Sequence, residues 1–365
     1  MNPIPSQFPD SSDIYSPEEA EATAARETVE ASAPLPVSTS VFAETRRTFS
    51  KVGLAYLVLV AALLTLSYAI QYALLFTAPW LLREWWMSWV LSLLPLYGGA
   101  LPLAWLILRR IPVAPHNPDF THRGVTEDKP SFGFGKFLIL LIIAFGCMTA
   151  GGLVGNIVMS LLSAIMDYDY ANGLADIVSE SPVWVTFIGT CICAPLGEEL
   201  LFRKLLIDRT RRFGDLPSIL LSGLLFGLFH GNLFQFFYAA AVGMLLAYLY
   251  TRTGKYWLCV IMHAAINLMG SIVMPNLAAL LPEDMVSFTN LLQPLIFLFV
   301  LLWQYGVLVA GIVLFCVFFS RRRLSRGTTP MYRENGASLM FLNVGMIACL
   351  AAMALLMAVN LIPIR

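Results

Sequence analysis

Long apolar runs alternate with short polar segments along this chain from residue 52 onward. Eight runs are long enough to cross a bilayer as helices, because a span needs about 20 mostly apolar residues. They lie at residues 52–76, 85–108, 135–163, 183–207, 233–251, 256–274, 292–319 and 338–361. A ninth run, 217–230, reaches only about 20 Å, so it needs shelter from neighbouring helices. The pattern predicts an all-α, polytopic membrane protein with about nine transmembrane helices.

The composition supports this class and argues against others. The 365 residues are 58% hydrophobic and 13% charged, and the formal net charge is zero. Soluble domains carry about twice that share of charged residues. A neutral chain offers no basic surface for nucleic acid, so we expect the lipid bilayer as its environment and no nucleic-acid partner. The six cysteines lie in apolar runs and form neither a disulfide framework nor a C-x-x-C metal pattern.

Polar segments divide the chain into four parts. Residues 1–45 are rich in Pro, Ser, Ala and Glu, which predicts a disordered cytoplasmic tail. We then expect N-terminal membrane helices with a cytoplasmic loop over 46–134, a central group of helices over 135–275, and C-terminal membrane helices over 276–365.

Lysine and arginine gather in every second loop, which predicts the orientation of the chain. They precede the first run, occur in 109–134 and 208–216, and follow the runs 233–251 and 292–319. Segments 165–182 and 275–290 carry acidic residues but no basic ones. Because basic loops stay in the cytoplasm, we expect a multi-pass protein of the cell membrane. Its N-terminus would be cytoplasmic and its C-terminus outside.

One apolar run contains three charged residues in close succession. Glu198, Glu199 and Arg203 lie within 183–207, whereas the other runs carry ionisable side chains only near their ends, apart from two histidines. A charge at bilayer depth costs about 2.5–3.5 kcal/mol, so such residues indicate a functional site. The two histidines in apolar segments are His230 and His263.

The spacing separates the roles of the two glutamates. Glu199 and Arg203 are four residues apart, which places them on one helix face and predicts an ion pair that supports the site. Glu198 lies about 100° around the helix, so it is left as the unpaired carboxylate that can serve as a general base. Pro195 and Gly197 interrupt the helix just before it, and the backbone carbonyl that this frees needs a polar partner or water.

The histidines reach a similar depth from other helices. At 1.5 Å per residue, Glu198, His230 and His263 lie about 15, 20 and 10 Å from the predicted cytoplasmic ends of their helices. His263 and Asn267 share one helix face and offer two hydrogen-bond donors suited to an oxyanion. Phe226 lies one turn before His230 and can pack against the pocket or exclude water. The alternative is that each histidine is buried and bonded only to a backbone carbonyl.

Three short motifs occur in order at these positions: E-E-x-x-x-R at 198–203, F-x-x-x-H at 226–230 and H-x-x-x-N at 263–267. Together they resemble the signature motifs of the CPBP intramembrane proteases. This family includes the CAAX-processing prenyl-protein endopeptidases, the bacteriocin-immunity (Abi) proteins and the lysostaphin-resistance-like proteins. The resemblance covers residues 135–275.

The resemblance implies an intramembrane endopeptidase of CAAX type, with a conical cavity between the fourth, fifth and seventh helices. Its substrates would be membrane-associated proteins or C-terminal peptides. By the same resemblance Glu198 and His230 activate water, and His263 and Asn267 hold the oxyanion. Glu199 and Arg203 then support the site.

The role of a metal ion is a separate question, because the family is traditionally classed with the metalloproteases. Glu198, His230 and His263 could supply three zinc ligands. The H-E-x-x-H helix of soluble zinc proteases is absent from the sequence. A glutamate-based mechanism gives each residue a role without metal. We therefore expect no required cofactor, with zinc as the alternative.

Two other functions would also place charges inside the membrane. A secondary transporter has ionisable residues at the midplane, but it usually shows paired broken helices in its two halves, and only one broken helix is evident here. A non-catalytic bacteriocin-immunity or scaffold protein could bind a peptide in the same cavity.

Overall fold

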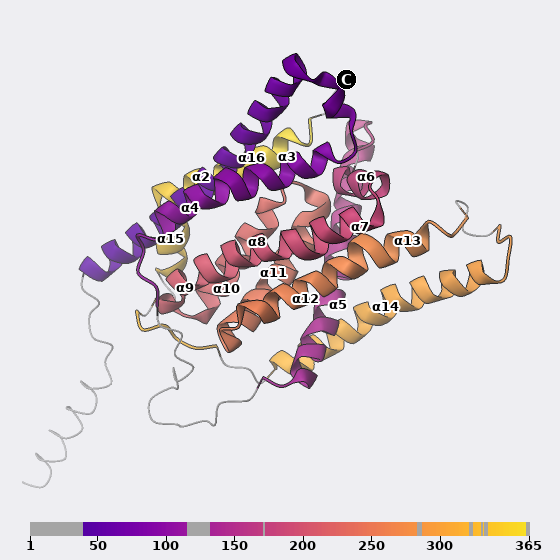
Figure 1. The fold of residues 1–365 in the computed structure, drawn as a ribbon. Coiled ribbons are helices and arrows are strands. Elements are labelled where there is room, and N and C mark those ends of the chain that lie inside the picture. The colour runs from indigo at the N-terminus through magenta and orange to yellow at the C-terminus, as the bar shows by residue number, and fades with distance from the viewer. Residues whose placement is uncertain are drawn as a thin grey trace, which may run out of the picture. The chain divides into compact units, whose positions relative to one another are not determined.

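The fold is that of a computed structural model, which describes residues 39–114, 132–170, 172–282, 287–320, 324–329, 331 and 335–362. The chain divides into two units, residues 1–43 and 44–365. Only residues 39–43 of the first unit are described, and they are helical. Every regular element in the described ranges is a helix, as Figure 1 shows. The all-α prediction is therefore confirmed.

Seven helices of the described ranges are long and apolar enough to cross a membrane. They are Ser40–Thr77, Met87–Leu108, Phe134–Met166, Val183–Phe213, Leu233–Thr253, Tyr256–Ala278 and Leu292–Phe319. Two shorter apolar helices, Asp215–Phe229 and Val344–Val359, occupy the places of the other two predicted spans. The chain is a multi-pass membrane protein, and a total of nine crossings stays a prediction.

Six of these nine helices are uninterrupted: α2 (Thr39–Thr77), α5 (Phe134–Met166), α10 (Asp215–Phe229), α11 (Leu233–Thr253), α14 (Leu292–Phe319) and α16 (Val344–Val359). Others contain π-helical turns. The second span joins α3 (Met87–Pro95), η2 (Leu96–Ala100) and α4 (Leu101–Leu108). The span Tyr256–Ala278 joins α12 (Tyr256–Leu268), η6 (Met269–Val273) and α13 (Met274–Ala278). Short helices η1 (Pro79–Arg83) and α6 (Gly173–Glu180) lie in the connections.

Helix α2 starts earlier than its hydropathy predicts. We expected the helix near residue 52 and a tail up to residue 45, but the helix begins at Thr39. Its first turns are amphipathic: Thr48 and Phe49 are buried, whereas Arg46 and Arg47 are exposed. The charges lower the hydropathy of this stretch, although one face packs against the protein. The rest of the predicted tail lies outside the described residues.

The last predicted run, 338–361, forms two helices, α15 (Gly336–Phe341) and α16 (Val344–Val359). Asn343 divides them, because its side-chain Oδ1 accepts a hydrogen bond from the Met346 amide at 3.0 Å and caps α16. Helix α16 then packs backbone to backbone on α2. A Cβ atom added to Gly53 would lie 2.4 Å from the carbonyl carbon of Gly345.

Glycines allow other helices to pack equally closely. A Cβ atom on Gly151 of α5 would lie 2.4 Å from the Cα atom of Tyr238 in α11. Helix α5 also packs on α14, where a Cβ atom on Gly146 would lie 2.8 Å from the Cα atom of Gly311. Small residues at such crossings are typical of helices packed in membranes. In this way α5 holds α11, which in turn packs on α10 near the candidate site.

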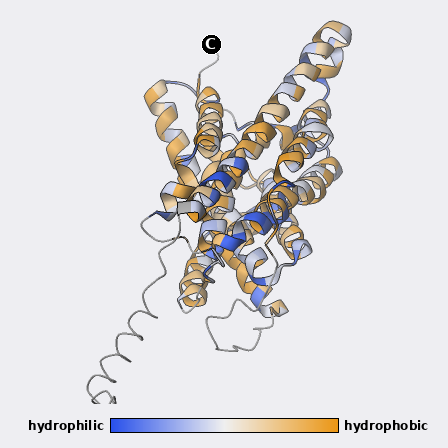
Figure 2. Cartoon of the chain, turned by 90° about the vertical axis from the view of Figure 1, so that its left-hand side faces the viewer, coloured by the Kyte–Doolittle hydropathy of each residue, from blue (hydrophilic) through white to orange (hydrophobic). Residues whose placement is uncertain are grey.

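The outer surface of the spans is apolar. Leu302, Tyr305, Val309 and Val317 along α14 are between 61% and 69% exposed. Figure 2 shows the same property over most helices, which are orange with a few blue stretches inside them. A continuous apolar surface of this kind fits contact with lipid chains.

The predicted orientation can be tested by cysteine labelling. We expect cysteines introduced at Asp176 and Glu283 to react with a membrane-impermeant thiol reagent in intact cells, because both lie in segments without basic residues. A cysteine at the exposed Lys255 should react only after the membrane is permeabilised. Labelling of Lys255→Cys in intact cells, with protection of the other two positions, would reverse the orientation.

Candidate active site

The span Val183–Phe213 carries the three charged residues and is irregular on both sides of them. It joins α7 (Val183–Thr186), η3 (Phe187–Cys193), α8 (Ala194–Glu199), η4 (Leu200–Leu205), α9 (Ile207–Thr210) and η5 (Arg211–Phe213). Glu198 and Glu199 end the α-helical stretch between the π-helical stretches η3 and η4. Ala194, for example, donates its amide proton to the carbonyl of Gly189, five residues earlier. The predicted interruption at Pro195 thus takes the form of π-helical turns, which often occur at functional sites.

Side chains from other helices bond to backbone carbonyls along this irregular span. Asn267 donates to the Thr190 carbonyl at 2.7 Å, Tyr97 to Cys193, Tyr256 to Leu196 at 2.7 Å, and Tyr56 to Leu201 at 2.8 Å. A polar group left unbonded in hydrocarbon costs several kcal/mol, so these contacts make the irregular backbone tolerable. They also fix the turn that presents the glutamates.

The ion pair predicted from the spacing is present. The Nε atom of Arg203 lies 2.8 Å from Oε2 of Glu199, and both side chains are fully buried. Arg203 also donates through Nη1 to the Ser222 hydroxyl of α10 at 2.6 Å. That hydroxyl in turn donates to the Phe202 carbonyl at 2.8 Å. The pair therefore ties the irregular span to α10.

His263 of α12 completes a cluster that the sequence did not predict. Its Nδ1 atom lies 2.9 Å from Oε1 of Glu199, and its Nε2 atom lies 3.8 Å from Oε2 of Glu198. The ring is 4% exposed. Because Glu199 is ionised opposite Arg203, its oxygen accepts and Nδ1 of His263 donates. Glu199 thus holds two partners from opposite sides, where the spacing indicated only Arg203.

Glu198 differs from its neighbour in accessibility. Its side chain is 14% exposed, whereas that of Glu199 is fully buried. Among the described residues, Glu198 makes no side-chain hydrogen bond, and its contact with His263 at 3.8 Å is longer than one. Glu198 is thus the more accessible of the two carboxylates, and its role as the base stays a prediction.

His230 caps the C-terminal end of α10 and is half-buried. Its Nδ1 atom lies 2.8 Å from the Phe226 carbonyl oxygen, which can only accept, so Nδ1 donates the hydrogen bond, and in a neutral ring the lone pair is then on Nε2. No hydrogen bond or ion pair joins His230 to Glu198, both of which the structure describes. His230 is therefore linked to the site through the ring of Phe226 and not through Glu198.

The ring of Phe226 packs against three members of the site. Its centroid lies 5.0 Å from that of His230 and 5.7 Å from that of His263. The guanidinium carbon of Arg203 lies 5.1 Å from the same centroid, in cation–π contact. The ring is 2% exposed, so it serves as the apolar wall between the two histidines.

Asn267 and His263 do not converge on one atom. The Nδ2 group of Asn267 donates one proton to the Thr190 carbonyl, whereas His263 faces the two glutamates. An amide nitrogen has two protons, so one donor of Asn267 stays available.

The described residues contain no group of three His, Cys, Asp or Glu side chains arranged to hold a metal ion. The candidate zinc ligands Glu198, His230 and His263 therefore do not form a ligand set in this arrangement. His263 is also turned through Nδ1 toward Glu199. No step of the chemistry below is routed through a metal.

These features define a helical membrane protein with a buried cluster of one carboxylate, a guanidinium and an imidazole, beside which a second carboxylate is partly accessible. A comparison with known families gives the same class. Residues 180–269 match the family described as "Type II CAAX prenyl endopeptidase Rce1-like". The matched segment contains all seven residues singled out in the sequence.

A curated relative supports this result. The chain is 27% identical over 127 residues to the protein named "Putative membrane peptidase YdiL" of Bacillus subtilis (strain 168). The match covers 34% of this chain and half the length of the relative. No solved structure matches the chain. The resemblance to the CPBP intramembrane proteases is thus confirmed over the region that carries the three motifs.

Proposed function

We propose that the protein is an intramembrane endopeptidase that hydrolyses peptide bonds of membrane-associated proteins or C-terminal peptides. The observation that carries this proposal is the contrast between two adjacent carboxylates. Glu199 is fully buried and holds both Arg203 and His263, while Glu198 is 14% exposed and makes no hydrogen bond among the described residues. A partly exposed carboxylate that makes no side-chain hydrogen bond in an apolar setting is suited to accept a proton from water.

In the proposed reaction, Glu198 takes a proton from a water molecule whose oxygen attacks the carbonyl carbon of the scissile peptide bond. His230 accepts the second hydrogen of that water in a hydrogen bond, because its Nε2 atom has a free lone pair. The peptide C–N bond then breaks, and the proton on Glu198 passes to the leaving nitrogen. The products are a carboxylic acid and an amine.

The negative charge on the substrate oxygen needs donors that are already in place. The second amide proton of Asn267 is one. His263 can be another only if it carries protons on both nitrogens, since its Nδ1 proton is directed at Glu199. Glu199 contacts the His263 ring at Nδ1, and Arg203 in turn holds the Glu199 carboxylate. Glu199 and Arg203 thereby position His263.

The test is a cleavage assay with the purified protein. Peptides with CAAX termini, prenylated and unprenylated, and internal membrane segments are incubated with the protein, and the products are identified by mass spectrometry. We expect new carboxyl and amino termini with the wild type and none with Glu198→Gln. Binding of a peptide without any cleavage would instead indicate the non-catalytic function.

The metal question has its own expected result. We expect peptide hydrolysis to survive exhaustive chelation, because the proposed steps use only Glu198, His230, His263 and Asn267. The measurement compares cleavage rates before and after chelation with the metal content of the same sample. Stoichiometric zinc that is lost together with activity, and restores it on return, would contradict this expectation.

A further inference from the structure

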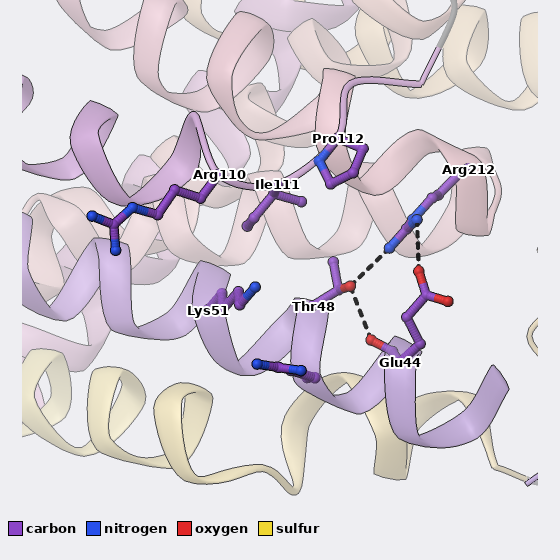
Figure 3. A pocket seen from close by; sticks show the side chains of 8 residues that line it. Glu44, Thr48, Lys51, Arg110, Ile111, Pro112 and Arg212 are labelled. Carbon is purple, nitrogen blue, oxygen red and sulfur yellow. Dashed lines mark hydrogen bonds and ion pairs between the residues drawn. The ribbon is translucent and has the colours of Figure 1, made fainter. Parts of the chain in front are cut away.

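A polar cavity lined by none of the candidate active-site residues lies between the first turns of α2, the end of α4 and η5 (Figure 3). Its volume is about 140 Å³, which is roughly ten times the space that one water molecule needs. It is lined by four cationic residues, one acidic residue and three others: Arg47, Lys51, Arg110, Arg212, Glu44, Thr48, Ile111 and Pro112. None of these residues belongs to the proposed catalytic machinery.

Arg212 is held in a fixed position at this cavity. Its Nη1 atom lies 3.2 Å from the Glu44 carboxylate, and its Nη2 atom donates to the Thr48 hydroxyl at 2.8 Å. The Thr48 hydroxyl donates in turn to the Glu44 carbonyl at 2.9 Å. Figure 3 shows these contacts as dashed lines. The Nε–H group of Arg212 is buried and has no partner among the described residues. One donor of a preorganised guanidinium is thus left unsatisfied.

The other three cations are not neutralised by the described part of the chain. Arg47, Lys51 and Arg110 make no hydrogen bond or ion pair with a described residue. Glu44 is the single acidic residue of the lining, and it pairs with Arg212. Like charges gathered at one cavity repel each other unless an anion joins them. The cavity therefore has the charge of an anion site.

An apolar surface continues directly from the cations on α2. Arg47, Lys51 and Leu54 follow at spacings of four and three residues, so they form one stripe along the helix. Leu54 is 44% exposed, and it lies further into the predicted span than Lys51. Along the stripe, the charged side chains of Arg47 and Lys51 thus lie nearer the start of α2, and the exposed apolar side chain of Leu54 lies deeper in the predicted span. A molecule with an anionic head and an acyl chain matches that order.

We propose that this cavity binds the phosphate group of an anionic membrane lipid. The guanidinium and ammonium donors suit phosphate oxygens. The ends of apolar helices lie at the depth of lipid head groups, and basic pockets between membrane helices bind such head groups. The exposed side chain of Leu54 can contact the acyl chain of a lipid, whereas inorganic phosphate has no apolar part that could make this contact.

The test measures melting of the full chain in detergent while phosphatidylglycerol, phosphatidylcholine or inorganic phosphate is titrated in. We expect phosphatidylglycerol to raise the melting temperature and the other two to have little effect. The double variant Lys51→Gln, Arg110→Gln should weaken the apparent affinity for phosphatidylglycerol about thirtyfold, because each cation near an anionic lipid contributes about a factor of five. The matched control is Lys204→Gln, Lys255→Gln. It removes two exposed cations outside the cavity and should respond like the wild type.

Three results would overturn the proposal. Equal protection by inorganic phosphate, lost in the Lys51 and Arg110 variant, would identify a free phosphate as the ligand. An equal response of the cavity variant and its control would mean that the lipid effect does not arise at this cavity. Residues 1–38 carry seven acidic residues and one basic residue. If phosphatidylglycerol protects only after these residues are deleted, the acidic segment of the chain itself is the occupant.

Discussion

Replacing Glu198 with glutamine is expected to lower the rate of peptide hydrolysis about 10²- to 10⁴-fold, the usual contribution of a positioned general base. The folded protein should tolerate the change. Glu198 is partly exposed and makes no side-chain hydrogen bond among the described residues, and glutamine has nearly the same shape. The substitution therefore leaves no buried charge without a partner.

This prediction requires activity and stability to be measured on the same preparation. Cleavage of a substrate peptide is followed alongside thermal melting in detergent. Glu180→Gln is the matched control, because it removes one carboxylate from an exposed position at the end of α6. We expect both variants to melt like the wild type, with only Glu198→Gln inactive. An active Glu198→Gln protein would remove this residue from the mechanism.

Replacing Glu199 with glutamine is expected to act first on stability. The substitution leaves the fully buried Arg203 without its carboxylate, and breaking one side of a buried pair costs about 3–5 kcal/mol in the free energy of unfolding. His263 loses its Nδ1 partner in the same change. We therefore expect a lower melting temperature in detergent, with activity falling as well because the imidazole is no longer oriented.

A double variant separates the cost of an unpaired buried charge from the loss of the two side chains themselves. Glu199→Gln combined with Arg203→Gln leaves neither charge alone, so part of the lost stability should return. Activity should stay low, because Nδ1 of His263 still lacks its Glu199 partner. If Glu199→Gln were stable but inactive, and Glu198→Gln unstable, the roles of the two glutamates would be reversed.

The sequence predicted those features that depend on local spacing. Apart from the start of α2 and the break at Asn343, hydropathy placed most span boundaries within a few residues, and the four-residue interval between Glu199 and Arg203 predicted their ion pair. Features that depend on contacts between distant segments were missed. His263 is 64 positions from Glu199, so no periodicity could indicate their hydrogen bond. The early start of α2 was missed because the charged residues on its exposed face lower the average hydropathy of a stretch whose other face is buried.

The Asn343 break was missed for a related reason. A capping side chain inside an apolar run changes the average hydropathy very little, although it ends one helix and starts the next. Similarly, Pro195 indicated that the helix of the site is irregular. It did not indicate that side chains of α2, η2, α10 and α12 would bond to the backbone carbonyls of this helix. Those partners depend on which helices lie alongside.

The hydroxyls of Tyr56 and Tyr97 limit how short a fragment of this chain could be and still fold, because both bond to the span that carries the two glutamates. They bond to the carbonyls of Leu201 and Cys193, yet they come from α2 and η2, well before residue 180, where the family match starts. A fragment cut to the matched segment would expose those two carbonyls to hydrocarbon. The family match therefore ends inside the folding unit, and the matched segment depends on helices that lie outside it.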